Sequence, residues 1–112
     1  MADNMRLIGL RRIKGELDTK GFESEIRNDR KDGPYINIGN VYRKNNRAQF
    51  WFDELSGKVF FWSGKNMGPW YQLTIDSEFK QPWEYLEDKE NKLEFPNITT
   101  AIEYIHKVAE LF

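Results

Sequence analysis

Residues 48–62 read AQFWFDELSGKVFFW and hold two apolar runs on either side of a short polar turn. In the first run, Phe50 and Phe52 alternate with Trp51, which is the period of a strand whose two faces differ. The second run, residues 58–62, is apolar on both faces, so it belongs inside a sheet rather than at its edge. The pattern predicts an antiparallel hairpin at the centre of the fold.

Further strands are predicted on both sides of this hairpin. Residues 22–27 alternate by twos, and residues 35–42 form the next strand after a polar loop. Gly39 inside that strand suggests a bulge or a close approach of the backbone. Residues 70–75 alternate again, and we expect an uncovered edge strand there through which two copies could pair as a homodimer.

The N-terminal and penultimate segments have weaker patterns. Residues 5–14 fit a helix about as well as a strand, and because Gly9 weakens the helical option we expect a strand. Residues 76–96 are acidic and contain two prolines. We expect one short helix starting near Pro82, with the rest of this segment forming a loop over the sheet.

The C-terminal segment is predicted to be an amphipathic helix. Thr100 and Glu103 have the spacing of a capping box, in which the two side chains satisfy backbone N–H groups of the first turn. Apolar residues recur at intervals of three and four, at Ile98, Ala101, Ile102, Ile105, Val108, Ala109 and Phe112. This stripe needs cover, and the sheet is the only large apolar surface available.

These elements together predict the fold class. We expect a single α+β domain over residues 1–112, with an antiparallel sheet of about four to five short strands packed against one C-terminal amphipathic helix. A long, partly irregular segment precedes that helix. The order of the elements is similar to that of Whirly-type single-strand-binding folds and of the arm-binding domains of phage integrases, and this similarity implies no functional position.

Composition limits the cellular setting. The chain contains no cysteine, which excludes disulfides, thiolate metal sites and cysteine nucleophiles and is typical of a reducing compartment. Residues 1–13 lack the continuous apolar run of a signal peptide, and no window approaches the roughly 20 apolar residues of a membrane span. We therefore expect a cytoplasmic protein without membrane contact.

Charge is unevenly distributed along the chain, although the net charge is −1. Residues 1–65 carry 13 Lys and Arg against 9 Asp and Glu, whereas residues 66–112 carry 4 against 9. A basic part can face nucleic acid, but two oppositely charged parts can equally attract each other inside one fold. The charge distribution leaves both interpretations open.

The sequence lacks the usual signs of catalysis. His106 is the only histidine, so a metal site built from several histidines is excluded. No phosphate-binding glycine loop, nucleophile elbow or calcium loop is present. Neighbouring carboxylates such as Asp53 and Glu54 are typical of solvated turns. We expect a non-enzymatic binding protein with no catalytic residue, no metal and no cofactor.

Aromatic and basic residues around the central hairpin suggest a nucleic-acid-binding surface. Bases stack on aromatic rings, while Lys and Arg follow the phosphates of a single strand. The predicted nucleic-acid-binding residues are Arg43, Lys44, Arg47, Trp51, Lys58 and Trp62. The predicted partner is single-stranded DNA or RNA, although the sequence pI near 5.9 is low for such a protein.

Two other interpretations remain open. The rings of Trp51, Phe60 and Trp62 could form a second small core beneath residues 76–96. Alternatively, the chain could be a protein-interaction module, such as a phage or bacterial inhibitor, adaptor or immunity-type protein. In that case the loop between two tryptophans would contact the protein partner through Lys65, Met67 and Trp70.

Overall fold

The computed structural model describes residues 2–31, 33–82 and 91–112, which form an α+β structure. Its helices are α1 (Ala2–Thr19), the 3-10 turn η1 (Lys44–Asn46), α2 (Pro69–Asp76) and α3 (Ile98–Glu110). Its strands are β1 (Ser24–Arg27), β2 (Tyr35–Gly39), β3 (Arg47–Phe52), β4 (Val59–Ser63), β5 (Lys80–Pro82) and β6 (Asn91–Phe95). These six described strands form one antiparallel sheet in the order β1-β2-β3-β4-β6-β5.

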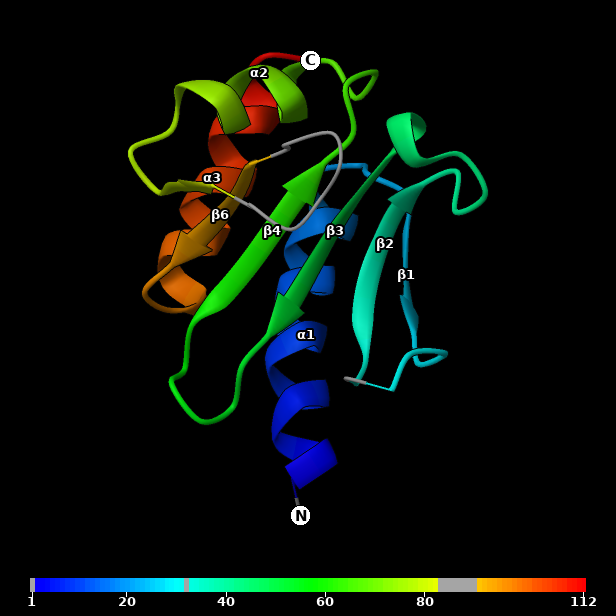
Figure 1. Cartoon of the computed structure of the whole chain (residues 1–112), viewed down its shortest axis with the longest axis vertical. Helices are drawn as coiled ribbons and strands as arrows, with labels where there is room; N and C mark the ends of the chain where they lie inside the picture. Colours follow the sequence, from blue (N-terminus) through cyan, green and yellow to red (C-terminus); the bar gives the residue numbers. More distant parts are fainter. Residues whose placement is uncertain (1, 32, 83–90) are drawn as a thin grey trace.

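The helices α1 and α3 lie together on one face of the sheet, behind it in Figure 1, while α2 lies near the end where the chain terminates. One register row crosses four neighbouring strands, and each of its side chains is fully buried: Ile36, Phe50, Phe61 and Leu93. Leu10, Ile13 and Leu17 of α1 and Ala101, Ile105 and Val108 of α3 belong to the same core. This core fixes which face of the sheet the helices cover.

The predicted alternation of the central hairpin is confirmed. Phe50 and Phe61 are paired and buried on the helix side, so Trp51 and Phe60, also paired, lie on the opposite face. The strand β4 lies between β3 and β6, as expected for a strand apolar on both faces. The sheet has more described strands than predicted, because the segment before α3 supplies β5 and β6.

The strand predicted at residues 5–14 is wrong, because this segment lies inside α1. Leu10, Ile13 and Leu17 have helical spacing and are all fully buried. A Cβ atom at Gly9 would lie 3.3 Å from side-chain atoms of Phe52 and Ile98. Gly9 therefore marks a close approach of α1 to the core rather than a break in the helix.

The edge strand predicted at residues 70–75 is also wrong, since these residues form α2. Pro69 occupies the first helical turn, where its missing N–H costs nothing. Trp70 and Thr74, one turn apart, are buried, and the Thr74 hydroxyl donates to the Trp70 carbonyl oxygen at 2.7 Å. The basis for pairing two copies through this segment is therefore lost. The short helix predicted to start near Pro82 falls largely on residues 83–90, outside the described residues.

The C-terminal helix is present, but its start differs from the prediction. Asn97 is the N-cap, and its Oδ1 accepts hydrogen bonds from the backbone N–H of Thr100 at 2.9 Å and from the Thr100 hydroxyl at 3.0 Å. The predicted capping pair of Thr100 and Glu103 is wrong because α3 begins earlier, at Ile98. Phe112, predicted as part of the buried stripe, is 70% exposed.

Replacing Asn97 with alanine tests this helix start. We expect Asn97→Ala to lower the free energy of unfolding by about 1 kcal/mol, because an N–H of the first turn loses its acceptor. Glu103→Ala, which removes the acceptor of the predicted capping box, should change it by less than about 0.5 kcal/mol. Urea unfolding followed by tryptophan fluorescence measures both. A larger loss for Glu103→Ala than for Asn97→Ala would contradict this cap.

Candidate nucleic-acid interface

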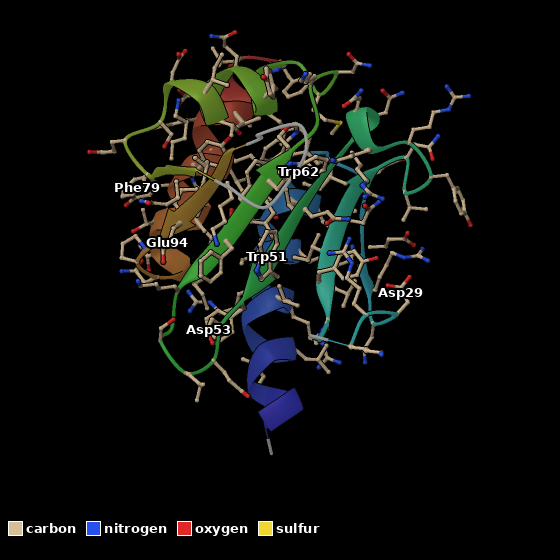
Figure 2. All side chains as sticks on the ribbon, viewed as in Figure 1. Asp29, Trp51, Asp53, Trp62, Phe79 and Glu94 are labelled. Atoms are coloured by element: carbon tan, nitrogen blue, oxygen red, sulfur yellow. The ribbon has the colours of Figure 1, made fainter. Side chains whose placement is uncertain are left out.

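The face of the sheet opposite the helices carries a row of aromatic rings. Trp51 and Trp62 both project from this face in Figure 2. The rings of Trp51 and Phe60 stack with centroids 5.8 Å apart and an interplanar angle of 18°. The sheet therefore brings together three of the aromatic residues that the sequence suggested, on one side of β3 and β4.

Cationic side chains lie over these rings. Lys44 Nζ lies 5.9 Å from the centroid of the Trp62 ring, and Arg47 Cζ lies 5.8 Å from it. Lys92 Nζ lies 4.8 Å from the centroid of the Phe60 ring. These are cation–π distances, so the rings already have partners within the chain.

Trp62 does not have the exposure that its predicted role requires. Its side chain is 4% exposed, so the expectation that it presents an open ring for base stacking is wrong. Trp51 and Phe60 are half-buried. This part of the face agrees better with a small second core, although any contribution of residues 83–90 to it lies outside the described residues.

Lys58 is separated from the other predicted basic residues. It lies immediately before β4, about 13 Å along the chain from Trp62 at the usual rise per residue of a strand. Its Nζ pairs with Glu94 Oε1 of β6 at 3.0 Å. Lys58 therefore belongs to a cross-strand ion pair at the opposite end of the sheet from η1.

The remaining basic residues lie close together at two connections, the one between β2 and β3 and the one between β4 and α2. The loop at residues 40–46 and the loop at residues 63–68 are joined by backbone hydrogen bonds, from Asn66 N to Asn45 O at 2.8 Å and from Gly64 N to Arg47 O at 2.8 Å. The Asn66 side chain also donates to Asn46 Oδ1 at 3.0 Å. We call the cations of these two loops, together with Arg47 at the start of β3, the basic corner: Arg43, Lys44, Arg47 and Lys65.

Two glycines allow the loops to dock this closely. A Cβ atom at Gly64 would collide with the Lys44 carbonyl oxygen and would lie 2.7 Å from Asn45 Cα. Gly39 has a φ of +90°, and a Cβ atom there would collide with the Asn46 carbonyl oxygen. The sequence predicted a close approach of the backbone at Gly39, and this prediction is confirmed: the backbone of Asn46 lies against Gly39 where the loop begins.

The segments that carry the basic corner contain charge of one sign. Residues 33–52 and 55–75 contain no Asp or Glu, and these stretches include every member of the corner. Arg43 and Lys65 are exposed, and neither forms an ion pair with another described side chain. Arg47 Nη1 donates to the Val41 carbonyl oxygen at 2.6 Å and so ties the loop to β3.

Tyr42 lies at the tip of this corner and is 90% exposed. Its backbone N–H is held by Asn40 Oδ1 at 2.9 Å, so the turn is fixed while the ring faces solvent. The sequence prediction of binding residues did not include Tyr42. The predicted strand over residues 35–42 included Tyr42, whereas β2 ends at Gly39. The place of Tyr42 directly beside Arg43 and Lys44 in the sequence was the available signal.

The alternative partner-binding residues are only partly brought together. Lys65 is exposed and Met67 is half-buried against the core, but Trp70 is 1% exposed. The Trp70 ring contacts the rings of Phe22, Phe50, Phe61 and Tyr104. The expectation that Trp70 faces a partner is wrong, because α2 directs this side chain inward.

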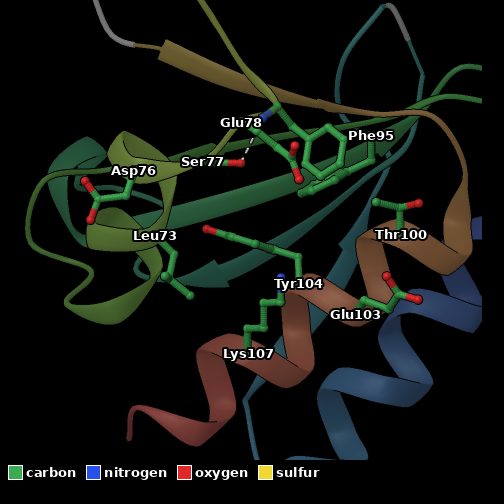
Figure 3. A pocket seen from close by; sticks show the side chains of 10 residues that line it. Leu73, Asp76, Ser77, Glu78, Phe95, Thr100, Glu103, Tyr104 and Lys107 are labelled. Carbon is green, nitrogen blue, oxygen red and sulfur yellow. Dashed lines mark hydrogen bonds between the residues drawn. The ribbon is translucent and has the colours of Figure 1, made fainter.

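A separate cavity of about 300 Å³ lies between α2, α3 and the strand β6, and Figure 3 shows its lining. Tyr104 is its buried polar residue, and the Tyr104 hydroxyl donates to the Trp70 carbonyl oxygen at 2.9 Å. Burial raises the pKa of Tyr104, so the phenol stays protonated at neutral pH. Tyr104 therefore offers this cavity neither a phenolate base nor a free hydroxyl.

Neither metal ligation nor a known relative assigns a role to the chain. Within residues 2–31, 33–82 and 91–112, no group of three or more His, Cys, Asp or Glu side chains is placed to hold a metal ion. None of the described helices is long and apolar enough to cross a membrane. Comparisons with protein-family models, curated proteins and solved structures find no match.

Adding one methyl group at Gly64 tests the docking of the two loops. We expect Gly64→Ala to destabilise the fold by about 1–3 kcal/mol, because backbone atoms of the facing loop would have to move. It should also speed hydrogen exchange at the Asn66 amide, whose acceptor is Asn45 O. Equilibrium unfolding and amide exchange measure the two effects.

Gly15 provides a matched control for this substitution. It lies inside α1 with nothing within 4 Å of an added Cβ atom, so Gly15→Ala should stabilise the protein by about 1 kcal/mol through helix propensity. Equal effects of the two substitutions would show that Gly64 is not sterically required.

Proposed function

We propose that this protein binds single-stranded nucleic acid through the basic corner, with Tyr42 as the stacking residue. The observation that carries the proposal is the convergence of Arg43, Lys44, Arg47 and Lys65 from two joined loops and the start of β3, segments that contain no acidic residue. Lys and Arg side chains supply the phosphate contacts that dominate affinity for nucleic acid.

Tyr42 favours a single strand over a duplex. Its exposed ring has room for an unstacked base on its face, whereas the bases of a duplex already stack on each other. The neighbouring amides of Asn40 and Asn45 lie in the same loop and can add hydrogen bonds to sugar or base edges. Trp62 takes a supporting role here, because Lys44 and Arg47 lie over its ring, while Trp51 stacks on Phe60.

The size of the corner predicts weak, salt-sensitive binding. Three to four phosphate contacts correspond to a slope of log affinity against log salt of about −2 to −3 for a single strand. The net charge of −1 adds no long-range attraction, so binding depends on the local charge of the corner.

Fluorescence anisotropy of labelled oligothymidylate and oligouridylate, titrated at low and at physiological salt, tests the proposal. We expect Arg43→Ala and Lys65→Ala each to weaken binding and to reduce the salt slope by about 0.7. Tyr42→Ala should weaken binding on the order of tenfold while leaving the salt slope unchanged, because it removes stacking rather than charge.

Lys107→Ala is the matched control, since Lys107 is an exposed cation on α3, on the helix side of the sheet. It should bind like the unmodified protein. Absence of binding at low salt, or an equal loss for Lys107→Ala and Arg43→Ala, would rule the basic corner out.

A protein partner is the second candidate, and one observation favours it. Met67 lines an apolar cavity of about 400 Å³ together with Phe22, Ile38 and the exposed Phe112. An interface centred on such residues would change little with salt. Salt-insensitive binding to a protein partner, combined with no oligonucleotide binding, would support this candidate instead.

A further inference from the structure

The strand β1 forms one border of the sheet. Among the described strands it pairs only with β2, and Figure 1 shows it outside β2 with no further strand beside it. Backbone N–H and C=O groups alternate in direction along an antiparallel strand, so half of those in Ser24–Arg27 point away from β2. Such a border pairs with a strand of another chain unless its side chains prevent it.

The other border of the described sheet is less suited to such pairing. The strand β5 has three residues and ends at Pro82, which has no N–H to donate. In contrast, β1 contains no proline, and its Ile26 is only partly buried against the core. Ile26 therefore leaves apolar surface at the border where a further strand can be added.

The strand β1 carries two opposite charges on one face. Glu25 and Arg27 are two residues apart, and Arg27 Nη1 donates to Glu25 Oε1 at 2.9 Å. Ile26 lies on the helix side, because its register partner Ile36 belongs to the buried row, so the two charges lie on the opposite face. Like charges at a border would repel a second copy, whereas this pair can attract one.

The register of a second copy decides whether these charges attract or repel. A two-fold pair of β1 strands that keeps the helices of both copies on one face of the sheet must be centred on a residue. Centring on Glu25 places this carboxylate opposite its own copy, and centring on Arg27 does the same for the guanidinium. Centring on Ile26 places Glu25 of each copy opposite Arg27 of the other, with the two Ile26 side chains facing each other.

We propose that two copies of this chain associate through β1, in the antiparallel register centred on Ile26, and so form one continuous sheet. A second copy is the partner because β1 is complementary to itself in this register, in backbone groups, in charge and in its apolar centre. The proposal goes beyond nucleic-acid binding and does not depend on it, since no member of the basic corner lies on β1.

The paired segment is short, so the association is weak. One step beyond the strand, Glu23 would face Asp29 of the other copy, and this like-charge pair limits the pairing to β1 itself. Asp29 is already held by the Tyr35 hydroxyl at 2.8 Å and by Arg27 Nη2 at 3.2 Å. Two strands of this length bury less than the roughly 1,200 Å² of a stable interface. We therefore expect a reversible dimer that forms at high protein concentration.

Sedimentation velocity of the full chain, up to millimolar concentration, tests the proposal. Glu25→Arg and Arg27→Glu each convert both cross-strand ion pairs into like-charge pairs, so each should weaken self-association by about tenfold or more. An equimolar mixture of the two variants should associate again, because the positive strand of one variant then faces the negative strand of the other. Local distortion of β1 by either substitution would not be repaired by mixing.

Lys58→Glu is the matched control. It breaks the cross-strand ion pair with Glu94, which joins β4 and β6 far from β1 in the order of strands. This variant should self-associate like the unmodified protein. Far-UV circular dichroism checks that all three variants are folded.

The unmodified protein reports the register directly. In a mixture of isotope-labelled and unlabelled chains, we expect an intermolecular nuclear Overhauser effect between the Ile26 methyl groups of the two copies. A monomer at millimolar concentration would overturn the proposal. So would undiminished association of both single variants, a mixture that associates no better than its components, or intermolecular contacts confined to another part of the chain.

Discussion

The burial of one cross-strand row of side chains governs the rest of this structure. Ile36, Phe50, Phe61 and Leu93 lie side by side across four strands and are removed from water by α1 and α3. Because side chains alternate along a strand, burying this row against the helices places every second residue on the opposite face of the sheet. The position of the Trp62 ring, over which Lys44 and Arg47 lie, is therefore a consequence of how the core is filled.

The opposite face shows how the chain distributes its aromatic residues. Trp62 and Phe60 are covered by cations from neighbouring strands and η1, which supplies the rings with partners and holds Lys44 and Arg47 in place. Such contacts contribute about 0.5–1 kcal/mol each at exposed sites and more where water is excluded. The rings thus support the basic corner, while Tyr42 remains at the surface.

Predictions from sequence succeeded at the central hairpin, where the period of two agrees with burial in the fold, and they failed where tertiary burial overrode the local pattern. The alternation around Phe50 and Phe61 identified β3, β4 and their faces. Residues 70–75 alternate just as clearly, but burial of Trp70 against the core selected a helix that starts at Pro69. Of the candidate site, Arg43, Lys44 and Arg47 stay together, whereas Lys58, Trp62 and Trp70 occupy structural roles.

The sequence by itself determined that this chain forms an α+β fold with an antiparallel sheet, because the spacing of its apolar residues is a local property that requires no knowledge of neighbours. Only the tertiary structure decided which aromatic rings are exposed and which cations lie over them. Those properties depend on register and on loop docking at Gly39 and Gly64, where segments distant in sequence come within contact distance. No local pattern encodes such distances.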